Sequence, residues 1–329
     1  MTDKIKTGLE NPYMSIELLP EFGAKLYSLR SKSSGRQWLW HNDRLPLAIP
    51  AYGDCYNTKL DSGGWDEIFP SVEPCELFLE GKRVSVPDHG ELVSQQAEIL
   101  ALRDDSISTR ICGKCADYTF ERRLTLDGKT LKINYKVANR GDFPLPFIWS
   151  AHPLLRLDDD IRFVVNEDIE LEAGAVFGDA PFVAGKRFGA VEFESVFSTS
   201  GVPAFAAKLF SKQGSWKWIA AVSSEAEEAL VFHSYGAADG YLALWYNNFG
   251  WSGPGYSVGY RNVGIEPCSS PFDSLERAVE TGNAPFVRQG DSAEWGLCAG
   301  LVKKDRHQSN ADWRELIKDY LSEYAKYEK

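Results

Sequence analysis

The residue types best suited to chemistry stand in three short segments, PDHG at 87–90, AHP at 151–153 and GIEP at 264–267. They contain His89, His152 and Glu266, each close to a Gly or Pro that sets the local backbone. Imidazole and carboxylate side chains are the groups that move protons near neutral pH. The chain has only five His, so few other imidazoles compete for this task. We predict that the three residues, from three strand-like regions, form one acid–base site.

Aromatic residues make up 13% of the chain and include ten Trp. Two interpretations stay open, a β-sheet core rich in aromatic side chains and a cleft whose flat rings stack on sugar rings. Together with the acid–base residues, a cleft lined with aromatic rings indicates a protein that acts on sugars. The more specific interpretation is that it interconverts the anomers of a sugar. The candidate substrate contacts are Trp65, Asp66, Trp149 and Trp245. Trp149 has the opposite strand parity to His152, so a core position also stays open for it.

The elements that must position these residues are β-strands. Apolar and polar side chains alternate in several segments, which is the period of a half-buried strand. Two such segments, 118–124 and 131–137, flank an Asp-Gly pair at 127–128, and this arrangement predicts a hairpin. Further strands are expected at residues 216–222, 230–234, 241–246, 260–266 and 294–301. Because no βαβ rhythm appears, the pattern predicts an all-β protein, a large antiparallel sandwich or barrel.

Two segments between the expected strands have a different character. Residues 53–90 have the pattern of a long irregular loop that carries Asp66, and loops of this length are usually functional. One short helix is expected at 272–279, with Ser270 or Asp273 as its N-cap. The loop is therefore expected to contribute to the substrate site.

The C-terminal segment predicts an amphipathic helix over residues 311–326. Its apolar stripe consists of Trp313, Leu316, Ile317, Tyr320, Leu321 and Tyr324. We expect a single β domain over residues 1–307 and a helical extension over residues 308–329. The stripe either packs on the protein's own sheet or forms a homodimer interface.

Charge and composition exclude several classes of partner. The formal net charge is −11, and a nucleic-acid partner requires a basic surface. The sequence has no signal peptide and no apolar run that spans a membrane, so we expect a cytoplasmic protein without a membrane partner. The pair Cys112 and Cys115 lacks a second Cys or His pair at zinc spacing, so no metal site is expected.

The chain is similar to the aldose 1-epimerase family, the galactose mutarotase-like group. The resemblance rests on five segments in order, LLPEFGAKLYSL at 18–29, PDHGE at 87–91, FIWSAHP at 147–153, GIEPC at 264–268 and QGDS at 289–292. They resemble the family's first hairpin, its two His motifs, the segment with its catalytic carboxylate, and the turn before its last core strand. Each segment alone is weak, whereas five in order over about residues 12–302 are specific.

The resemblance implies an antiparallel β-supersandwich with few short helices and a sugar cleft on one sheet. It implies conversion between the α and β anomers of a free hexose, a monosaccharide substrate. By the same resemblance, Glu266 corresponds to the general base and His152 to the general acid. His89 corresponds to a histidine that binds the sugar and assists at the ring oxygen. A carboxylate and a protonated imidazole suffice for this chemistry, so no cofactor and no metal are expected.

One departure from the family leaves the substrate sugar open. The segment GGWDEIFP at 63–70 stands where galactose-acting members carry an Asn-Arg pair. An epimerase of a phosphorylated or sulfonated hexose is therefore an alternative, with Lys59, Lys82 and Arg83 as cations for the anionic group. A second alternative is a non-catalytic sugar-binding protein on the same scaffold, although such a protein would have no use for both a base and an acid.

Overall fold

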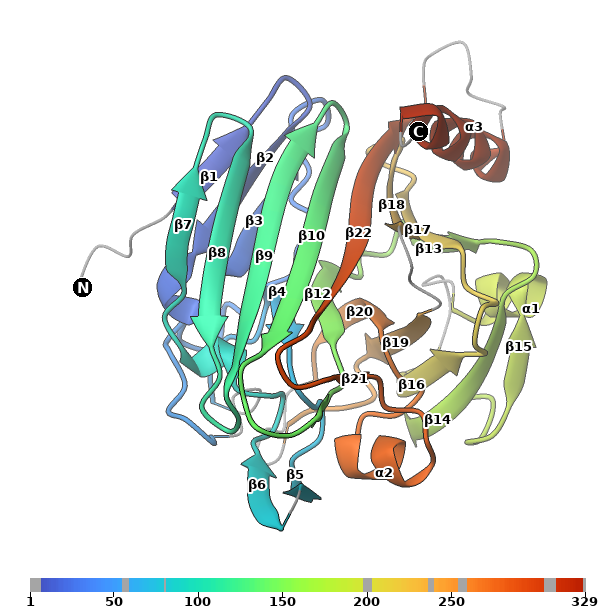
Figure 1. Cartoon of the computed structure of the whole chain (residues 1–329). Helices are drawn as coiled ribbons and strands as arrows, with labels where there is room; N and C mark the ends of the chain where they lie inside the picture. The colour runs from blue at the N-terminus through green and yellow to red at the C-terminus, as the bar shows by residue number, and fades with distance from the viewer. Residues whose placement is uncertain are drawn as a thin grey trace.

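Two antiparallel β-sheets packed face to face make up most of the protein (Figure 1). The computed structural model describes residues 7–54, 59–79, 81–197, 203–235, 240–253, 259–304 and 312–327. One sheet has ten strands and the other has eight. All strand pairings within both sheets are antiparallel. The expected all-β antiparallel sandwich is therefore confirmed.

The spatial order of the strands in each sheet differs from their order along the chain. From edge to edge, the ten-stranded sheet consists of β1 (Thr7–Glu10), β2 (Met14–Leu19), β3 (Lys25–Ser31), β4 (Gly64–Ile68), β12 (Ser150–Arg156), β20 (Arg261–Cys268), β19 (Tyr241–Asn248), β16 (Phe205–Ser211), β14 (Glu170–Gly178) and β15 (Arg187–Gly189). The eight-stranded sheet consists of β13 (Ile161–Val165), β17 (Trp218–Ser223), β18 (Glu228–Tyr235), β22 (Ser292–Lys303), β10 (Thr130–Asn139), β9 (Tyr118–Asp127), β8 (Ser106–Cys112) and β7 (Glu98–Leu102). Two short pairs are β5 (Cys75–Leu79) with β6 (Lys82–Val86), and β11 (Leu145–Pro146) with β21 (Phe286–Val287).

The predicted Asp-Gly hairpin joins β9 to β10, with Asp127 opposite Thr130. Gly128 takes left-handed backbone with φ +55°, which a residue without Cβ adopts readily. Alternate side chains of both strands, including Leu124 and Ile133, are buried in the core between the sheets. The period-two pattern therefore arises because one face of each strand packs against the opposite sheet.

A polar network crosses this otherwise apolar core. Glu67 on β4 accepts hydrogen bonds from Arg122 at 2.9 Å, Tyr135 at 3.0 Å and the Trp149 indole at 2.9 Å. Burial raises the pKa of Glu67, and these three donors, Arg122 above all, oppose that rise. Because Arg122 and Tyr135 belong to the eight-stranded sheet, the network connects the two sheets at one buried carboxylate.

The expectation of an irregular loop over residues 53–90 is wrong for much of its length. β4 lies inside the large sheet between β3 and β12, and β5 and β6 form a separate hairpin at the bottom of Figure 1. All five residues of β4 are buried. A strand covered on both faces has no alternation of polar and apolar residues, so its sequence lacks the period-two signal.

Helices are few and short, as expected. They are α1 (Ala190–Val196), α2 (Leu275–Glu280), α3 (Trp313–Tyr327) and the 3₁₀ turns η1 (Pro20–Phe22) and η2 (Leu92–Ser94). The predicted caps of α2, Ser270 and Asp273, are wrong. Ser274 is the N-cap, and its hydroxyl accepts a hydrogen bond from the Arg277 backbone at 3.3 Å. The Asp273 side chain therefore does not cap the helix and is available to contact other residues.

The C-terminal helix α3 packs on the outer face of the eight-stranded sheet (Figure 1). Trp313 and Ile317 are buried there in a cluster with Trp218, Val231 and Val302. The apolar stripe is thus covered by the chain's own sheet, which is the first of the two arrangements expected for it. The expected boundary between residues 307 and 308 lies outside the described residues.

His233 on β18 lies beneath α3, where the ring centroid of Tyr324 is 4.9 Å from that of the imidazole. Burial lowers the pKa of His233 from 6.5 to about 4. The unfolded chain takes up this proton below its own pKa of 6.5 while the folded protein does not. The stabilising contribution is therefore complete above pH 6.5 and is lost as the pH falls toward 4.

We predict that His233→Gln reduces the acid sensitivity of folding. Each pKa unit corresponds to about 1.4 kcal/mol, so His233 accounts for about 3 kcal/mol of the stability lost on acidification. Urea unfolding of both proteins at about pH 7.5 and about pH 4.5 measures this difference. An identical loss of stability in wild type and variant would contradict the prediction.

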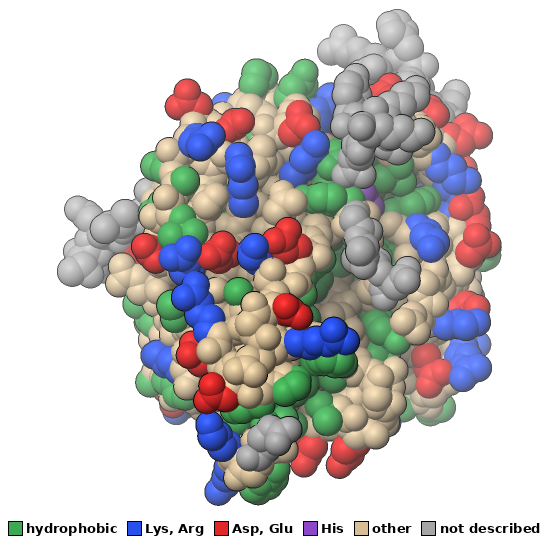
Figure 2. All heavy atoms as spheres, in the orientation of Figure 1, with side chains coloured by type: hydrophobic (Ala, Val, Ile, Leu, Met, Phe, Trp, Pro, Cys, Tyr) green, Lys and Arg blue, Asp and Glu red, His purple; other side chains and the backbone are tan. Residues whose placement is uncertain are grey.

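The surface mixes acidic and basic side chains over the face shown in Figure 2. Among the described residues, none of the helices has the length and apolar character needed to cross a membrane.

Candidate functional site

Five ionisable side chains form a row across the outer face of the ten-stranded sheet. The strand register places Asp66 on β4 opposite His152 on β12. The pairings on either side of His152 place it opposite Glu266 on β20. Lys25 on β3 contacts Asp66, and Lys208 on β16 contacts Glu266. Residues opposite one another share a face, so cation, anion, imidazole, anion and cation follow one another across the sheet.

Glu266 is the most deeply buried member of this row, with 0% of its surface exposed. The Lys208 ammonium donates a hydrogen bond to Oε2, whereas Oε1 has no hydrogen-bond partner among the described residues. A Cβ on Gly264, two residues earlier, would lie 2.5 Å from Oε1. The carboxylate therefore lies over a glycine, and Pro267 favours the extended backbone that holds it there. A buried acceptor without a donor lowers the stability of the folded protein, and such groups are typical of functional sites.

His152 faces the unpartnered oxygen of this carboxylate. Its Nε2 lies 3.7 Å from Glu266 Oε1. Burial lowers the pKa of His152 well below its ordinary value, and the nearby His89, Lys208 and Lys25 lower it further. This environment favours the neutral imidazole, and the role of His152 as general acid stays a prediction.

His89 reaches the same site from a turn rather than from a strand. It follows β6, and its φ of +55° is uncommon for a residue with a side chain. Its ring centroid lies 5.7 Å from that of His152 in an edge-on arrangement, and its Nδ1 lies 3.0 Å from Asp88 Oδ1. The three predicted acid–base residues, His89, His152 and Glu266, are thus brought together.

Glu91 anchors the turn that carries His89. This buried carboxylate accepts hydrogen bonds from the Tyr118 hydroxyl at 2.5 Å and from the backbone of Lys114 and Cys115 at 2.9 and 3.0 Å. The CGKC segment at 112–115 therefore has a structural task in the described protein. Burial and the adjacent Glu91 raise the pKa of the Cys115 thiol, so it is held protonated.

The predicted substrate contacts divide between the two faces of the sheet. Trp65 is 0% exposed and packs in the core on Phe232 at 5.7 Å between ring centroids. Trp149 also lies in the core, where its indole donates to Glu67. Asp66 lies on the outer face but is paired with Lys25 at 2.5 Å. The structure therefore does not bring Trp65 or Trp149 to the site, because strand parity turns them inward.

Trp245 on β19 has the position expected of a residue at the site. It lies opposite Lys208 of β16 and shares its face of the sheet. Its ring is half-buried and lies 5.5 Å from that of Trp251 and 6.1 Å from that of Phe177 between centroids. An aromatic surface is therefore available beside the acid–base row.

Lys208 and Asp273 are site residues that the sequence reasoning missed. The Lys208 ammonium contacts Glu266 and lies 3.6 Å from Asp273 Oδ1. Burial acts to lower the pKa of Lys208, but Asp273 and Glu266 together raise it above its ordinary value. Burial raises the pKa of Asp273, and the nearby charge of Lys208 opposes this rise. The available signal was a single Lys inside the apolar run FAAKLF at 205–210, since a buried Lys requires partners.

The described residues contain no group of three His, Cys, Asp or Glu side chains that could hold a metal ion. A carboxylate oxygen without a donor, an imidazole within reach of it and a fixed ammonium form a site for proton transfer.

Comparison of the whole structure with solved structures identifies the class of fold. A protein from Synechocystis sp. PCC 6803 matches with a TM-score of 0.68 and 15% identity, covering 91% of this chain and 96% of that one. A galactose mutarotase related enzyme from Lactobacillus acidophilus matches with a TM-score of 0.66 and 15% identity, covering 92% and 99%. A galactose mutarotase-like protein from Lactobacillus casei gives 0.62 and 15%, covering 90% and 100%.

These matches establish the galactose mutarotase-like β-sandwich fold for this chain. They span nearly the full length of both partners, so the resemblance concerns the whole domain. No protein-family model and no curated protein matches the sequence. At this level of identity the similarity defines the fold, and the chemistry must be argued from the site.

Proposed function

We propose that the protein is an aldose 1-epimerase, a mutarotase that interconverts the α and β anomers of a sugar. The observation that carries the proposal is Oε1 of Glu266, which has no hydrogen-bond partner in the described part of the chain and lies 3.7 Å from Nε2 of His152. Mutarotation removes a proton from the C1 hydroxyl and delivers one to the ring oxygen, and both oxygens are attached to the same carbon. An acceptor and a donor this close together fit that demand.

In the proposed reaction Glu266 Oε1 accepts the proton of the C1 hydroxyl. His152 supplies a proton to the ring oxygen, the C1–O5 bond breaks, and the open aldehyde rotates before the steps reverse. Lys208 keeps its hydrogen bond to Oε2, so the carboxylate stays oriented while Oε1 reacts. The low pKa of His152 makes its protonated form scarce but a strong acid. His89, beside His152, is assigned to binding the sugar near its ring oxygen.

The positions of Lys59, Lys82 and Arg83 do not favour a phosphorylated or sulfonated sugar as the substrate. Lys82 and Arg83 lie on the exposed β5–β6 hairpin, where they pair with Asp142 at 3.9 Å and Glu76 at 2.7 Å. Lys59 is exposed as well. A non-catalytic sugar-binding protein is disfavoured because it would not need a buried carboxylate oxygen that lacks a donor.

A panel of sugars tests the proposed activity and identifies the substrate. Freshly dissolved α-glucose, α-galactose, other aldoses and their 6-phosphates are followed by polarimetry with and without protein. We expect the approach to equilibrium to accelerate in proportion to protein concentration for at least one neutral sugar. Acceleration of phosphorylated sugars alone would establish the alternative, and no acceleration of any sugar would overturn the proposal.

We predict that Gly264→Ala lowers the mutarotation rate without unfolding the protein. The added Cβ would lie 2.5 Å from Glu266 Oε1, so the carboxylate must move. Displacement of a catalytic group by about 1 Å can cost about 100-fold in rate. The matched control is Gly189→Ala, where a Cβ meets nothing within 4 Å. Equal rates for the two variants, with unchanged circular dichroism, would contradict the importance of this contact.

A further inference from the structure

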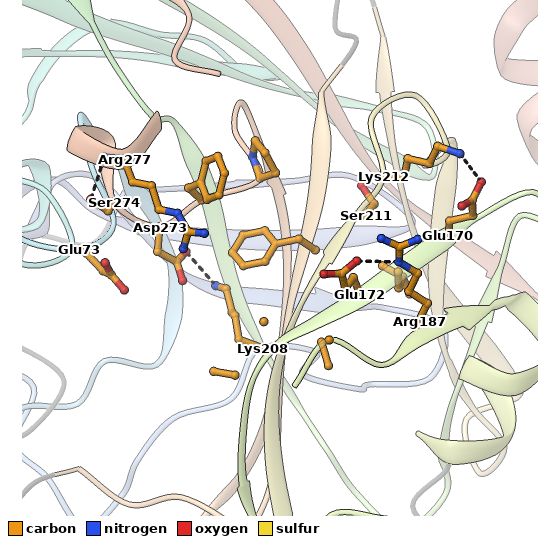
Figure 3. Close-up of a pocket in the computed structure, with 18 residues that line it drawn as sticks. Glu73, Glu170, Glu172, Arg187, Lys208, Ser211, Lys212, Asp273, Ser274 and Arg277 are labelled. Atoms are coloured by element: carbon orange, nitrogen blue, oxygen red, sulfur yellow. Dashed lines mark hydrogen bonds and ion pairs between the residues drawn. The ribbon is translucent and has the colours of Figure 1, made fainter. Parts of the chain in front are cut away.

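A pocket of about 720 Å³ opens on the outer face of the ten-stranded sheet, next to the acid–base row (Figure 3). Its walls come from β14, β15 and β16 and from the segment that leads into α2. In Figure 3, Asp273 and Arg277 lie to one side of Lys208, and Glu172 and Arg187 lie to the other. Neither Glu266 nor His152 lines this pocket. The pocket therefore lies beside the reacting pair, which it reaches through Lys208.

Lys208 connects the pocket to the reacting pair. Its ammonium donates to Glu266 Oε2 and lies 3.6 Å from Asp273, and both Lys208 and Asp273 line the pocket. A ligand whose reacting carbon lies at Glu266 can therefore extend past Lys208 into this space. Pockets of about 300–1,000 Å³ enclose ligands of drug size, which is more than the single ring engaged by the acid–base pair requires.

The pocket wall carries equal numbers of cations and carboxylates. The cations are Arg187, Lys208, Lys212 and Arg277. The carboxylates are Glu73, Glu170, Glu172 and Asp273. Two ion pairs form between these groups, Lys212 with Glu170 and Arg187 with Glu172, each at 2.8 Å. A wall whose charges balance provides many donors and acceptors without attracting a net charge, which suits a neutral polyhydroxyl group rather than a phosphate.

Two aromatic side chains complete the lining. Phe210 on β16 and Phe272, ahead of α2, both line the pocket and are half-buried. The Arg277 guanidinium lies over the Phe272 ring at 4.6 Å from its centroid. β14 contains a bulge between Ala173 and Ala175 beside Phe210, and bulges are frequent next to active sites. Rings of this kind offer flat apolar surface to the C–H face of a sugar.

We propose that the substrate is the reducing end of a neutral disaccharide or longer oligosaccharide. The reducing ring lies at Glu266 and His152, and the next sugar unit occupies the pocket between Phe272 and Glu172. This inference names the substrate class of the proposed mutarotase and so rests on that function. It predicts tighter binding of a disaccharide than of its reducing-end monosaccharide.

Calorimetric titration with sugars already at anomeric equilibrium measures binding apart from catalysis. Maltose, cellobiose and lactose are compared with glucose on the wild-type protein. We expect at least one disaccharide to bind about tenfold tighter than glucose, and Phe272→Ala to remove that preference while glucose binding is unchanged. Phe78→Ala, an exposed Phe on the β5–β6 hairpin, is the matched control and should change nothing. Glu172→Gln tests the opposite wall if Phe272→Ala does not fold.

The outcomes separate this inference from the proposed activity. Equal affinities for disaccharides and glucose, or a preference unchanged in both pocket variants, would overturn the oligosaccharide assignment even if glucose mutarotates. Preferential disaccharide binding without acceleration of mutarotation for any sugar would support the pocket and overturn the mutarotase.

Discussion

Glu266→Gln should lower the mutarotation rate by about 10²–10⁴-fold, the usual contribution of one proton-transfer group. Glutamine has nearly the same shape, and its amide oxygen can still accept the hydrogen bond from Lys208. It cannot take the proton of the C1 hydroxyl. The loss should therefore appear in kcat, with sugar binding largely preserved.

The matched control is Glu228→Gln. Glu228 is also a buried strand glutamate, but its carboxylate accepts hydrogen bonds from Ser31 and the Trp38 indole, in the eight-stranded sheet and away from His152. It should retain the wild-type rate if it folds. A Glu266→Gln protein with at least a tenth of the wild-type rate would show that Glu266 is not the base.

Glu67→Ala should destabilise the folded protein by about 3–5 kcal/mol, as expected when one partner of a buried ion pair is removed. The change leaves Arg122 charged in the core, where its side chain is only 2% exposed. It also removes the acceptor of the Tyr135 hydroxyl and the Trp149 indole. Because these donors come from both sheets, the packing of one sheet against the other should weaken as a whole.

Urea unfolding followed by Trp fluorescence measures this loss. Glu172→Ala, which removes an exposed ion pair with Arg187, is the comparison and should cost no more than about 1 kcal/mol. A loss below about 1 kcal/mol for Glu67→Ala would mean that the inter-sheet network adds little to stability.

The sandwich could be predicted from the sequence because its signals are local. Strands with one buried face, such as β9 and β10, show alternation within a few residues, and Gly128 marks the turn between them. The three acid–base residues could be found because Gly and Pro accompany them in distinctive short segments. Their assembly at one site follows from strand register, which places His152 between Asp66 and Glu266.

The rest of the site depends on contacts between distant strands. Lys208 lies 58 residues before Glu266 in the sequence, and only the pairing of β16, β19 and β20 brings them together. Trp65 belongs to a strand buried on both faces, so neither its strand nor the direction of its ring could be predicted from periodicity. The lowered pKa of His152 arises from burial and neighbouring cations, which are properties of the folded state.

Two-dimensional exchange NMR of a reducing sugar in D₂O tests the proposed mutarotation most directly. We predict exchange cross-peaks between the α and β H1 signals that grow with added wild-type protein and not with Glu266→Gln. We also predict that the hydrogens on C1 and C2 stay in place, because ring opening breaks only O–H and C–O bonds. Absence of exchange above the uncatalysed rate for every sugar would contradict a mutarotase, and deuterium entry at C2 would indicate chemistry at carbon instead.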